Sequence, residues 1–494
     1  MKFSFSVFIF FLLCLLLAPL EVTKPQTFNG DWNCLYATID DQPNATGYNT
    51  ASVGVIKENT FVALVTDRVG TNPAFSDYCY LVGYTNADSI NGRMGYYEYA
   101  SNIIMQWSSG FDAVNMNYAF DIAATKDSLI FVANNDPDRN ILVFKMSSDS
   151  VISTDYRLAT NADSLWAIDV DDNGYVYVTT IGVPPNKGRV LVYKGIQQEP
   201  DAWGVTHSLT PLQEITVPDT GKTQGVAVNS NGSLLYVSNY DLDVVYCYVG
   251  SPTTGYSLYN GFDFSIANDT LTATTGAFLN PGPWGLGFMD NKNILFVACA
   301  NYFQLGAGYQ YGRIYAVNPN TGEKLDTIDC AAWNFAMTGS WSSRPGGTLG
   351  TVSGYTSPYN VDFDENFNVY TVSFYGWTVD KWQFSGTIPT ILITILDIEK
   401  DETTIPEQFS LAQNYPNPFN PTTTIEFSLP QDANISLSVY SINGELVTNI
   451  IDNTSFSKGN YKLTFDASKL ASGNYVYVLT NNELRLSRKM TLIK

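Results

Sequence analysis

The chain of 494 residues has few of the groups on which several classes of protein depend. Only 26 residues are Lys or Arg against 47 Asp and Glu, so the clustered positive charge that binds nucleic-acid phosphates is missing. The formal charge is −21, which we interpret as a source of solubility outside the cell. Stretches with the periodicity of amphipathic helices are also absent, whereas aromatic residues reach 14%. This composition predicts an all-β protein of two or three folded units.

Groups for nucleophilic or metal-assisted catalysis are equally sparse. His207 is the only histidine, so a Ser-His-Asp relay or a histidine-based metal site would need this one residue. It stands in WGVTHS at 203–208, a stretch typical of a loop between strands, and no G-x-S-x-G motif is present. We therefore expect a solvated loop histidine, and we assign no catalytic residue.

Cysteine spacing does not point to a metal site. Cys14 lies in the first segment, and none of the other five cysteines has the C-x-x-C spacing of metal ligands. An exported chain can oxidise some of them, for example Cys34 with Cys79, whereas unpaired cysteines pack as small apolar side chains. We expect buried thiols at most positions.

Residues 1–24 begin with Met1 and Lys2 and continue with an apolar run from Phe3 to Leu20. This pattern predicts a secretory signal peptide. A transmembrane anchor is the alternative, but no basic cluster follows the run. We therefore expect no integral membrane segment after signal cleavage.

The middle of the chain contains a repeat: two alternating apolar strands joined by a tight turn, then a third strand. The clearest copy is LWAIDVDDNGYVYVTT at 165–180 with GRVLVYK at 188–194, and further strand pairs lie at 52–67, 120–134, 223–239, 283–299 and 359–373. About six such units, each too small to bury both faces alone, predict a β-propeller. Seven blades stay open as an alternative, because residues 28–50 and 387–398 can each supply a closing strand.

One turn of the repeat begins like a calcium-binding EF-hand loop. The run Asp169–Gly174 has that pattern, but Thr180 stands where the loop needs an acidic residue. Sister copies place Asn229–Gly232 and Asp362–Asn366 at the same point of the repeat. The run therefore predicts a repeated hairpin turn.

The repeat resembles the NHL and gluconolactonase-like six-bladed propellers, whose blades read GIAVD-x-DG-x-IYVAD followed by RI-x-VF. The resemblance covers roughly residues 50 to 385 and implies the fold, which binding scaffolds and enzymes share. The gluconolactonase-like enzymes hold a central calcium ion with Asn, Asp and Glu at the loops that lead into the innermost strands. At these positions the chain carries what we name the strand-start residues: Trp166, Gln224, Trp284, Tyr359 and Asn360.

The strand-start residues predict a ligand-binding site for a glycan, a protein or a small molecule, through stacking and hydrogen bonds. Alternatively, the aromatic rings simply fill the axis. Aromatic residues replace oxygen ligands at three of the four strand starts, so we assign no cofactor and no metal, calcium being the one candidate. The Gly-, Ser- and Thr-rich segment 331–358 predicts either a binding loop or a connector.

The composition changes after Ile398, and the charged residues 399–407 predict a linker. Residues 408–494 then contain NYPNPFNP at 414–421, alternating strands at 424–430 and 435–440, and Asn443–Gly444, a pair typical of a type I′ hairpin turn. The alternation predicts a small Ig-like β-sandwich. The whole domain resembles the type A sorting domain of type IX secretion substrates in Bacteroidetes and related phyla.

This second resemblance implies that the outer-membrane translocon reads the domain, and that the cargo is then released or attached to the cell surface. An ordinary sandwich used for adhesion is the alternative. The residues that the resemblance marks as the sorting signal are Asn414, Tyr415, Pro416, Asn417, Pro418, Phe419, Asn420, Pro421, Gly473, Lys489 and Lys494.

The sequence thus predicts an all-β chain with a signal peptide at 1–24, a β-propeller of about six blades at 28–398, a linker at 399–407 and the sorting domain at 408–494. The expected function is that of a secreted or surface-attached propeller that binds a ligand or a protein. The alternatives are a calcium-dependent lactonase or hydrolase and a purely structural module of a surface layer.

Overall fold

The computed structural model describes residues 28–38, 49–66, 79–87, 93–94, 119–136, 139–147, 151–158, 164–182, 185–203, 210–266, 282–300, 312–339, 357–373, 378–391, 393, 398–401, 406–456, 458–467, 470–481 and 484–494. The predicted signal peptide, His207 and most of segment 331–358 lie outside these ranges. Within them, no helix has the length and apolar character needed to cross a bilayer.

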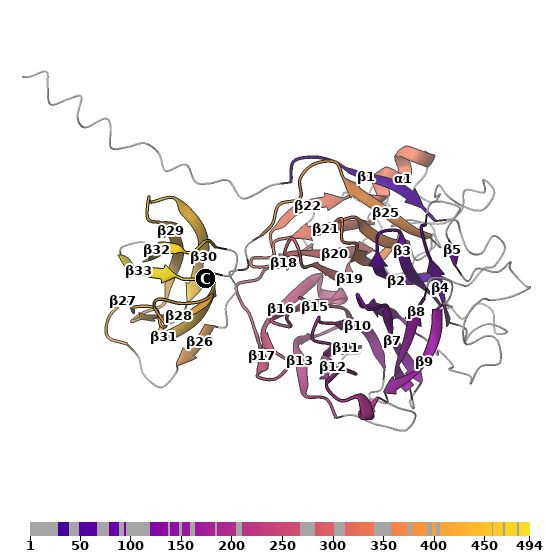
Figure 1. Cartoon of the computed structure of the whole chain (residues 1–494), viewed down its shortest axis with the longest axis horizontal. Coiled ribbons are helices and arrows are strands. Elements are labelled where there is room, and N and C mark those ends of the chain that lie inside the picture. The colour runs from indigo at the N-terminus through magenta and orange to yellow at the C-terminus, as the bar shows by residue number, and fades with distance from the viewer. Residues whose placement is uncertain are drawn as a thin grey trace, which may run out of the picture.

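Six antiparallel sheets, numbered here as blades 1 to 6, make up the larger body (Figure 1). Blade 1 has β2 (Asn49–Lys57), β3 (Thr60–Thr66), β4 (Cys79–Tyr84) and β5 (Arg93–Met94); blade 2 has β6 (Asp121–Ala124), β7 (Leu129–Asp136), β8 (Arg139–Met146) and β9 (Val151–Leu158). Blade 3 has β10 (Leu165–Val170), β11 (Val176–Thr180), β12 (Lys187–Tyr193) and β13 (Gln213–Thr220). Blade 4 has β14 (Thr223–Val228), β15 (Leu234–Asn239), β16 (Val244–Ser251), β17 (Gly255–Leu258) and β18 (Phe264–Ser265).

Blade 5 has β19 (Gly282–Met289), β20 (Ile294–Ala300), β21 (Arg313–Val317) and β22 (Lys324–Ile328); blade 6 has β23 (Pro358–Phe363), β24 (Val369–Ser373) and β25 (Thr378–Phe384). The first strand of each blade contacts the first strand of the next, and β23 returns to β2, so the six sheets form a closed ring. This is a six-bladed β-propeller, as the repeat predicted.

The ring is closed by the N-terminal strand β1 (Trp32–Ala37), which pairs with β25 and completes blade 6. The pairing runs antiparallel from Trp32↔Phe384 to Ala37↔Asp380. Residues 28–50 therefore supply a closing strand, and the number of blades is six.

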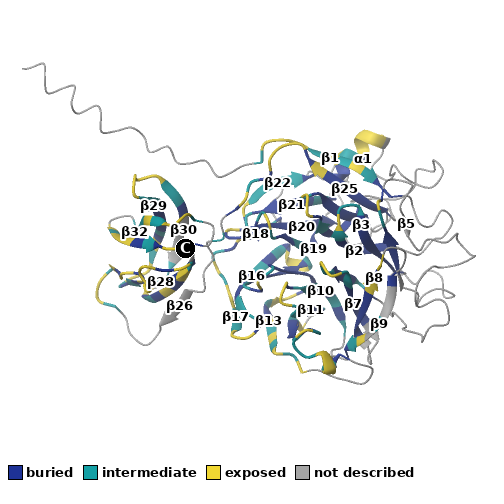
Figure 2. Ribbon diagram, in the orientation of Figure 1, coloured by how far each residue is buried: buried dark blue, intermediate teal, exposed yellow. Residues whose placement is uncertain are grey.

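The predicted three strands of each unit are present, but the fourth strand was missed. The repeat in the sequence ends with its third strand, whereas blades 3 and 5 add β13 and β22 after it. Each of these outer strands has only one buried residue, so their sequences lack the strong apolar pattern of the inner strands. Figure 2 shows the consequence: the inner strands are buried, and exposed residues gather on the periphery.

A short helix, α1 (Cys330–Thr338), lies at the start of the segment predicted as a loop or connector. The Asp329 side chain accepts a hydrogen bond from the backbone N–H of Ala332, and the helix ends at Gly339 with φ 71°. Trp333 packs on Trp382 of β25 with ring centroids 5.3 Å apart. The sequence of this helix has little amphipathic period. Its stability therefore comes from packing on the propeller.

Cys34, Cys247, Cys299 and Cys330 are thiols without a disulfide, which confirms the expectation for these positions. Cys247, Cys299 and Cys330 are buried in the propeller. Cys34 is therefore not bridged to Cys79, whose side chain lies outside the described part of the chain.

The smaller body is a sandwich of two four-stranded sheets. One sheet has β26 (Ile398–Asp401), β31 (Gly459–Asp466), β28 (Thr422–Leu429) and β27 (Ser410–Leu411); the other has β30 (Leu446–Phe456), β29 (Ala433–Ser441), β32 (Gly473–Thr480) and β33 (Arg485–Leu492). Alternate residues of the strands form its core, among them Ile425, Phe427, Leu437, Val439 and Leu479.

Two details of the sandwich differ from the sequence predictions. Strand β26 pairs with β31, so the first strand of the sandwich begins at Ile398, the last residue of the predicted propeller, and takes in residues 399–401 of the predicted linker. The hairpin at Asn443–Gly444 is present, but only Gly444 has a positive φ, of 86°. The Gly444 N–H donates to the Ser441 carbonyl, a turn that does not require the type I′ backbone at Asn443.

Candidate functional site

The strand-start residues lie at irregularities of the blade ladders. The pairing register shifts between Leu165 and Ile168, and it shifts at the same point in blades 4, 5 and 6. Trp166, Gln224 and Trp284 each lie inside such a shift, as does Tyr359. A β-bulge re-aims a side chain, which explains how successive blades direct a large residue towards the axis.

The aromatic strand-start residues pack on one another. The rings of Trp284 and Tyr359 are stacked with centroids 3.9 Å apart, and Trp166 lies 6.1 Å from Trp284. Phe120 stacks on Trp166 at 4.1 Å. Trp284 is 4% exposed and Tyr359 2% exposed. The structure thus brings the three aromatic strand-start residues together, with their rings packed against one another.

Two glycines allow the blades to approach each other at this end of the axis. A Cβ on Gly225 would lie 2.4 Å from the Trp284 carbonyl oxygen, and one on Gly285 would lie 2.3 Å from the Tyr359 carbonyl oxygen. Real side chains do not tolerate such distances, so the residue after the bulge has to be glycine in blades 4 and 5.

The two amide strand-start residues have different surroundings. Gln224 is 2% exposed, and neither atom of its amide has a hydrogen-bond partner. Asn360 donates to an Asp121 carboxylate oxygen at 2.9 Å and accepts the Val53 backbone N–H at 3.4 Å. Asn360 therefore links blade 6 to blades 1 and 2, which is a structural role.

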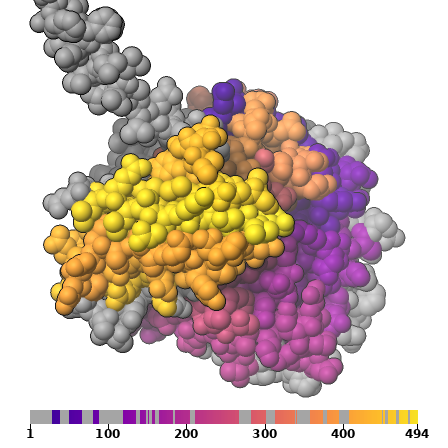
Figure 3. Space-filling model, turned by 60° about the vertical axis from the view of Figure 1, so that its left-hand side comes forward, coloured from indigo at the N-terminus to yellow at the C-terminus, as the bar shows by residue number. Residues whose placement is uncertain are grey.

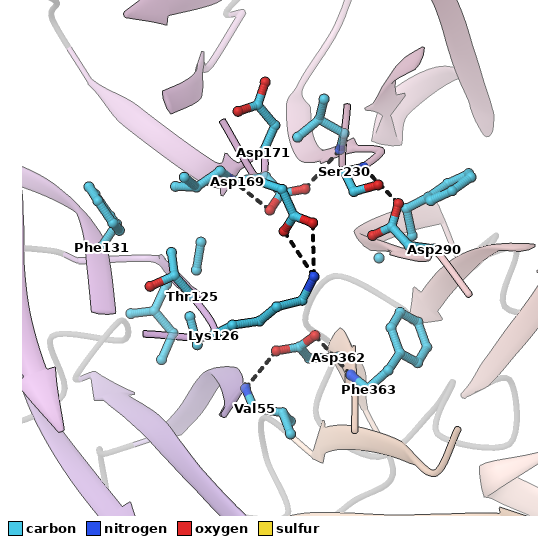
Figure 4. A pocket seen from close by; sticks show the side chains of 18 of the residues that line it. Val55, Thr125, Lys126, Phe131, Asp169, Asp171, Ser230, Asp290, Asp362 and Phe363 are labelled. Carbon is cyan, nitrogen blue, oxygen red and sulfur yellow. Dashed lines mark hydrogen bonds and ion pairs between the residues drawn. The ribbon is translucent and has the colours of Figure 1, made fainter. Parts of the chain in front are cut away.

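A cavity of about 630 Å³ opens on the axis among the ends of the inner strands and the turns that follow them (Figure 4). Of the strand-start residues, only Asn360 lines it. Its walls combine apolar side chains of the inner strands with carboxylates. The apolar residues include Val55, Ile168, Val228, Phe288 and Phe363, and the acidic ones include Asp121, Asp169, Asp171, Asp290 and Asp362.

The carboxylates hold neighbouring blades together. Asp169 of blade 3 accepts the N–H of Val228 in blade 4 at 2.8 Å, and Asp362 of blade 6 accepts the N–H of Val55 in blade 1 at 2.6 Å. Asp290 accepts the N–H of Ser230 at 2.6 Å. Inner strands have no partner strand on the axis side, so these side chains satisfy N–H groups that would otherwise be unpaired.

Burial makes these carboxylates weak acids. Loss of water raises the pKa of Asp362 to about 7, although two backbone N–H groups stabilise its charged form. Burial also raises the pKa of Asp169 well above its usual range, and the charges of Asp362 and Asp290 raise it further. Near neutral pH these carboxyl groups can therefore be neutral or ionised, and a charged group that binds next to them changes the balance.

One cationic side chain lines the described part of the cavity. Lys126, in the turn after β6, forms an ion pair with Asp172 in the turn after β10, at 2.8 Å. Both side chains are exposed, so the pair contributes little to stability. It joins the turns of blades 2 and 3, and both residues line the cavity. Figure 4 shows Lys126 extending among the carboxylates of the cavity.

Sequence reasoning missed this cavity, although the same residues gave a signal. The turn prediction for Asp169–Gly174 is confirmed: Asp171 accepts the N–H groups of Asn173 and Tyr175 and closes the β10–β11 hairpin. Asp169 and Asp362, however, stand at a repeat position that holds Ala227 in blade 4 and Gly287 in blade 5. An acidic residue at a repeat position that is small and apolar in other blades was the sequence signal that pointed to this cavity.

The residues predicted as the sorting signal come together at one end of the sandwich. Asn414 is buried and donates to the Thr423 hydroxyl at 2.9 Å. The Asn417 amide donates to the Lys489 carbonyl at 3.2 Å. Gly473 pairs with Leu492, and the Lys494 N–H donates to the Ser472 hydroxyl at 3.0 Å. The proline-rich opening and the last strand therefore form one unit.

The sandwich also matches a known family. Residues 413–494 match the secretion system C-terminal sorting domain. This match to a type IX sorting domain indicates that the chain is exported, to the cell surface or into the medium.

No curated protein is significantly similar to the chain. Among solved structures, a gluconolactonase from Xanthomonas campestris is 12% identical with a TM-score of 0.39, over 72% of this chain and 90% of that one. The calcium-binding regucalcin from Agrobacterium tumefaciens is 9% identical with a TM-score of 0.39, over 74% and 97%. The β-propeller domain of Swd1 from Myceliophteria thermophila is 8% identical with a TM-score of 0.36, over 71% and 99%.

The rings of Trp166, Trp284 and Tyr359 lie packed on one another at the strand starts. A calcium ion takes six to eight oxygen ligands, and stacked rings do not supply such a set. Across the described residues, no group of three or more His, Cys, Asp or Glu side chains is arranged to hold a metal ion.

Proposed function

We propose that this chain is an exported binding protein whose propeller takes an organic cation into the axial cavity. The cation is a small amine or the basic side chain of a partner protein. The C-terminal sandwich serves export and takes no part in this binding. The observation that carries the proposal is the cavity of about 630 Å³, in which apolar walls surround the carboxylates of Asp169, Asp290 and Asp362.

The chemistry of the cavity supports a ligand with an apolar body and a positively charged end. Valine, isoleucine and phenylalanine side chains suit a hydrocarbon portion. A cation beside a buried carboxyl group stabilises the ionised form, so binding of the cation lowers the raised pKa of that group. The formal charge of −21 also attracts cations to the molecule.

The test compares two ligands that differ in charge alone. Isothermal titration calorimetry of the full chain with hexylammonium and with hexanol should show binding of the amine that strengthens between pH 6 and pH 8. Substitutions Asp169→Asn and Asp362→Asn should each weaken amine binding about tenfold, the value of one charged hydrogen bond. Asp201→Asn, on the exposed turn at Pro200–Ala202, is the matched control and should leave the affinity unchanged.

Three other results would contradict binding of a cation in the axial cavity. Equal affinity for hexanol and hexylammonium would refute the role of the carboxylates. Binding of a glycan that is lost in Trp166→Ala and Trp284→Ala would place the ligand at the aromatic end instead. Lactone hydrolysis that a chelator abolishes would favour a calcium-dependent enzyme.

A further inference from the structure

The two bodies of the chain differ in charge. Residues 406–494 contain seven Lys and Arg and seven Asp and Glu, so the whole formal charge of −21 falls on residues 1–405. Four of those seven basic residues lie in the last ten positions: Arg485, Arg488, Lys489 and Lys494. The sandwich from residue 406 onward therefore has no net formal charge, and its positive charge gathers on β33 and the residues that follow.

Strand β33 is the last strand of its sheet, where it pairs with β32 along its length and bridges only Phe419 on its other side. Arg485, Arg488 and Lys489 are exposed, and within the described residues none of them forms an ion pair. In Figure 3 the C-terminal part of the chain, in yellow, faces solvent on the side turned towards the viewer. An edge strand with exposed backbone groups is where another strand can add.

The backbone directions show which part of this edge is open. The Lys489 carbonyl accepts the Asn417 amide, and the Thr491 N–H donates to the Asn417 side chain, so both groups point away from β32. Backbone direction repeats every second residue along a strand, so the N–H groups of Arg485 and Ser487 point the same way. No described residue accepts a hydrogen bond from either of them on that side.

The open edge adjoins the proline-rich opening of the sorting domain. Phe419 pairs with Leu492, which places residues 413–419 along the second half of β33. Tyr415 in this segment is 81% exposed, although hydrogen bonds to Thr424 hold its backbone on both sides. An aromatic side chain held in solvent by a rigid backbone is typical of a contact residue.

We propose that the open edge of β33, from Arg485 to Lys489, is the docking strand of the sorting domain, and that its partner is an acidic protein strand. Backbone carbonyls of the partner accept the N–H groups of Arg485 and Ser487, and its carboxylates pair with Arg485, Arg488 and Lys489. Tyr415 lies beside this strand as an apolar contact. This inference concerns export alone and is independent of ligand binding by the propeller.

Export of the full chain from a host with a type IX secretion system tests both halves of the proposal. Reversing the charges with Arg485→Glu, Arg488→Glu and Lys489→Glu together should reduce the exported fraction about tenfold or more, measured by immunoblot of medium, cell surface and periplasm. Ser487→Pro removes one outward N–H without changing any charge, and it should reduce export similarly.

Matched variants separate docking from folding. Lys458→Glu changes charge elsewhere on the sandwich, Ser487→Ala keeps the backbone N–H, and Arg488→Lys keeps the charge; all three should be exported like the parent chain. Thermal unfolding of each purified chain should show unchanged melting of the sandwich. Because the ligand titrations use purified protein, failure of this proposal and failure of the binding proposal remain distinguishable.

Two outcomes would overturn the inference. Normal export of the triple variant with unchanged melting would show that the basic residues only protect a free edge from unwanted pairing. Normal export combined with loss of binding to vesicles that contain anionic lipid would assign the basic strand to the membrane surface and not to a protein.

Discussion

Asp169 and Asp362 occupy the same position of the repeat in blades 3 and 6, on opposite sides of the six-membered ring, and each accepts an N–H from the next blade. Asp169 bonds Val228 at 2.8 Å, and Asp362 bonds Val55 at 2.6 Å. Two opposite joints of the ring are thus held by carboxylates that also line the axial cavity. Because the same two carboxylates join blades and line the cavity, a change in their protonation affects both the stability of the ring and the charge of the cavity.

The stability of the propeller should therefore depend on pH through Asp362. Its pKa of about 7 in the folded chain exceeds the ordinary value of 3.8, so the folded state keeps a proton that the unfolded state has released. The contribution is fully present below pH 3.8 and is lost as pH rises through 7. Asp362→Asn should lose less stability than the parent chain between pH 5 and pH 8, measured by urea unfolding. An equal loss in both chains would contradict the raised pKa.

Gly285→Ala should destabilise the ring by about 1–3 kcal/mol, the usual cost of overpacking. The added methyl would lie 2.3 Å from the Tyr359 carbonyl oxygen, and because its three nearest neighbours are all backbone atoms of Tyr359 and Asn360, little can move aside. Gly473→Ala is the control, since its nearest neighbour outside the adjacent residues is a ring carbon of Tyr475 at 3.9 Å. Circular dichroism measures the melting temperatures of both variants. Equal melting temperatures would show that blades 5 and 6 accommodate the added methyl group without loss of stability.

Glu58→Ala should cost about 1–2 kcal/mol, because it removes the main ion-pair partner of a buried lysine. Lys381 is 2% exposed and donates to Glu58 at 2.8 Å and to the Asn59 side chain at 2.9 Å, which joins blade 6 to blade 1. Glu58 is itself partly exposed, so the effect stays below that of a fully buried pair. Asp172→Ala breaks the exposed pair with Lys126 and should change the free energy of unfolding by less than about 0.5 kcal/mol. Urea unfolding measures both free energies. Equal losses in Glu58→Ala and Asp172→Ala would contradict a larger contribution of the ion pair with the buried lysine.

Removal of β1 should open the ring. A chain that begins at residue 39 lacks the strand that pairs with β25, and the edge of blade 6 is then unpaired. We expect a lower melting temperature than for a chain that begins at residue 28, and partial recovery when a peptide of residues 28–38 is added. An unchanged melting temperature would mean that blade 6 is stable with three strands.

The local sequence determined much of the architecture, for physical reasons that are themselves local. Alternation such as Val226 and Val228 identifies a strand, because neighbouring side chains point to opposite faces. Turn residues such as Asn173 and Gly174 mark the hairpins. Six copies of a unit that cannot bury its own surface leave a closed array as the stable solution. The sorting domain is likewise recognised from the order of its motifs along the chain, without information on contacts between distant residues.

Long-range packing decided what the sequence did not show. The outer strands β13 and β22 and helix α1 depend on neighbours that no local period reveals. The strand-start residues Trp284 and Tyr359 were recognised, but only the folded ring shows that they stack on each other. The position of the cavity among the turns after the inner strands was likewise settled in three dimensions.

The chain by itself therefore determined its all-β class, its array of about six repeats and its export domain, because periodicity and turn chemistry act between residues close in sequence. Only the tertiary structure decided that Asp169 and Asp362 face one cavity, and that residues 414–421 lie beside the basic strand β33. Such relationships join residues far apart along the chain, and their distances and desolvation exist only once the blades and sheets have packed.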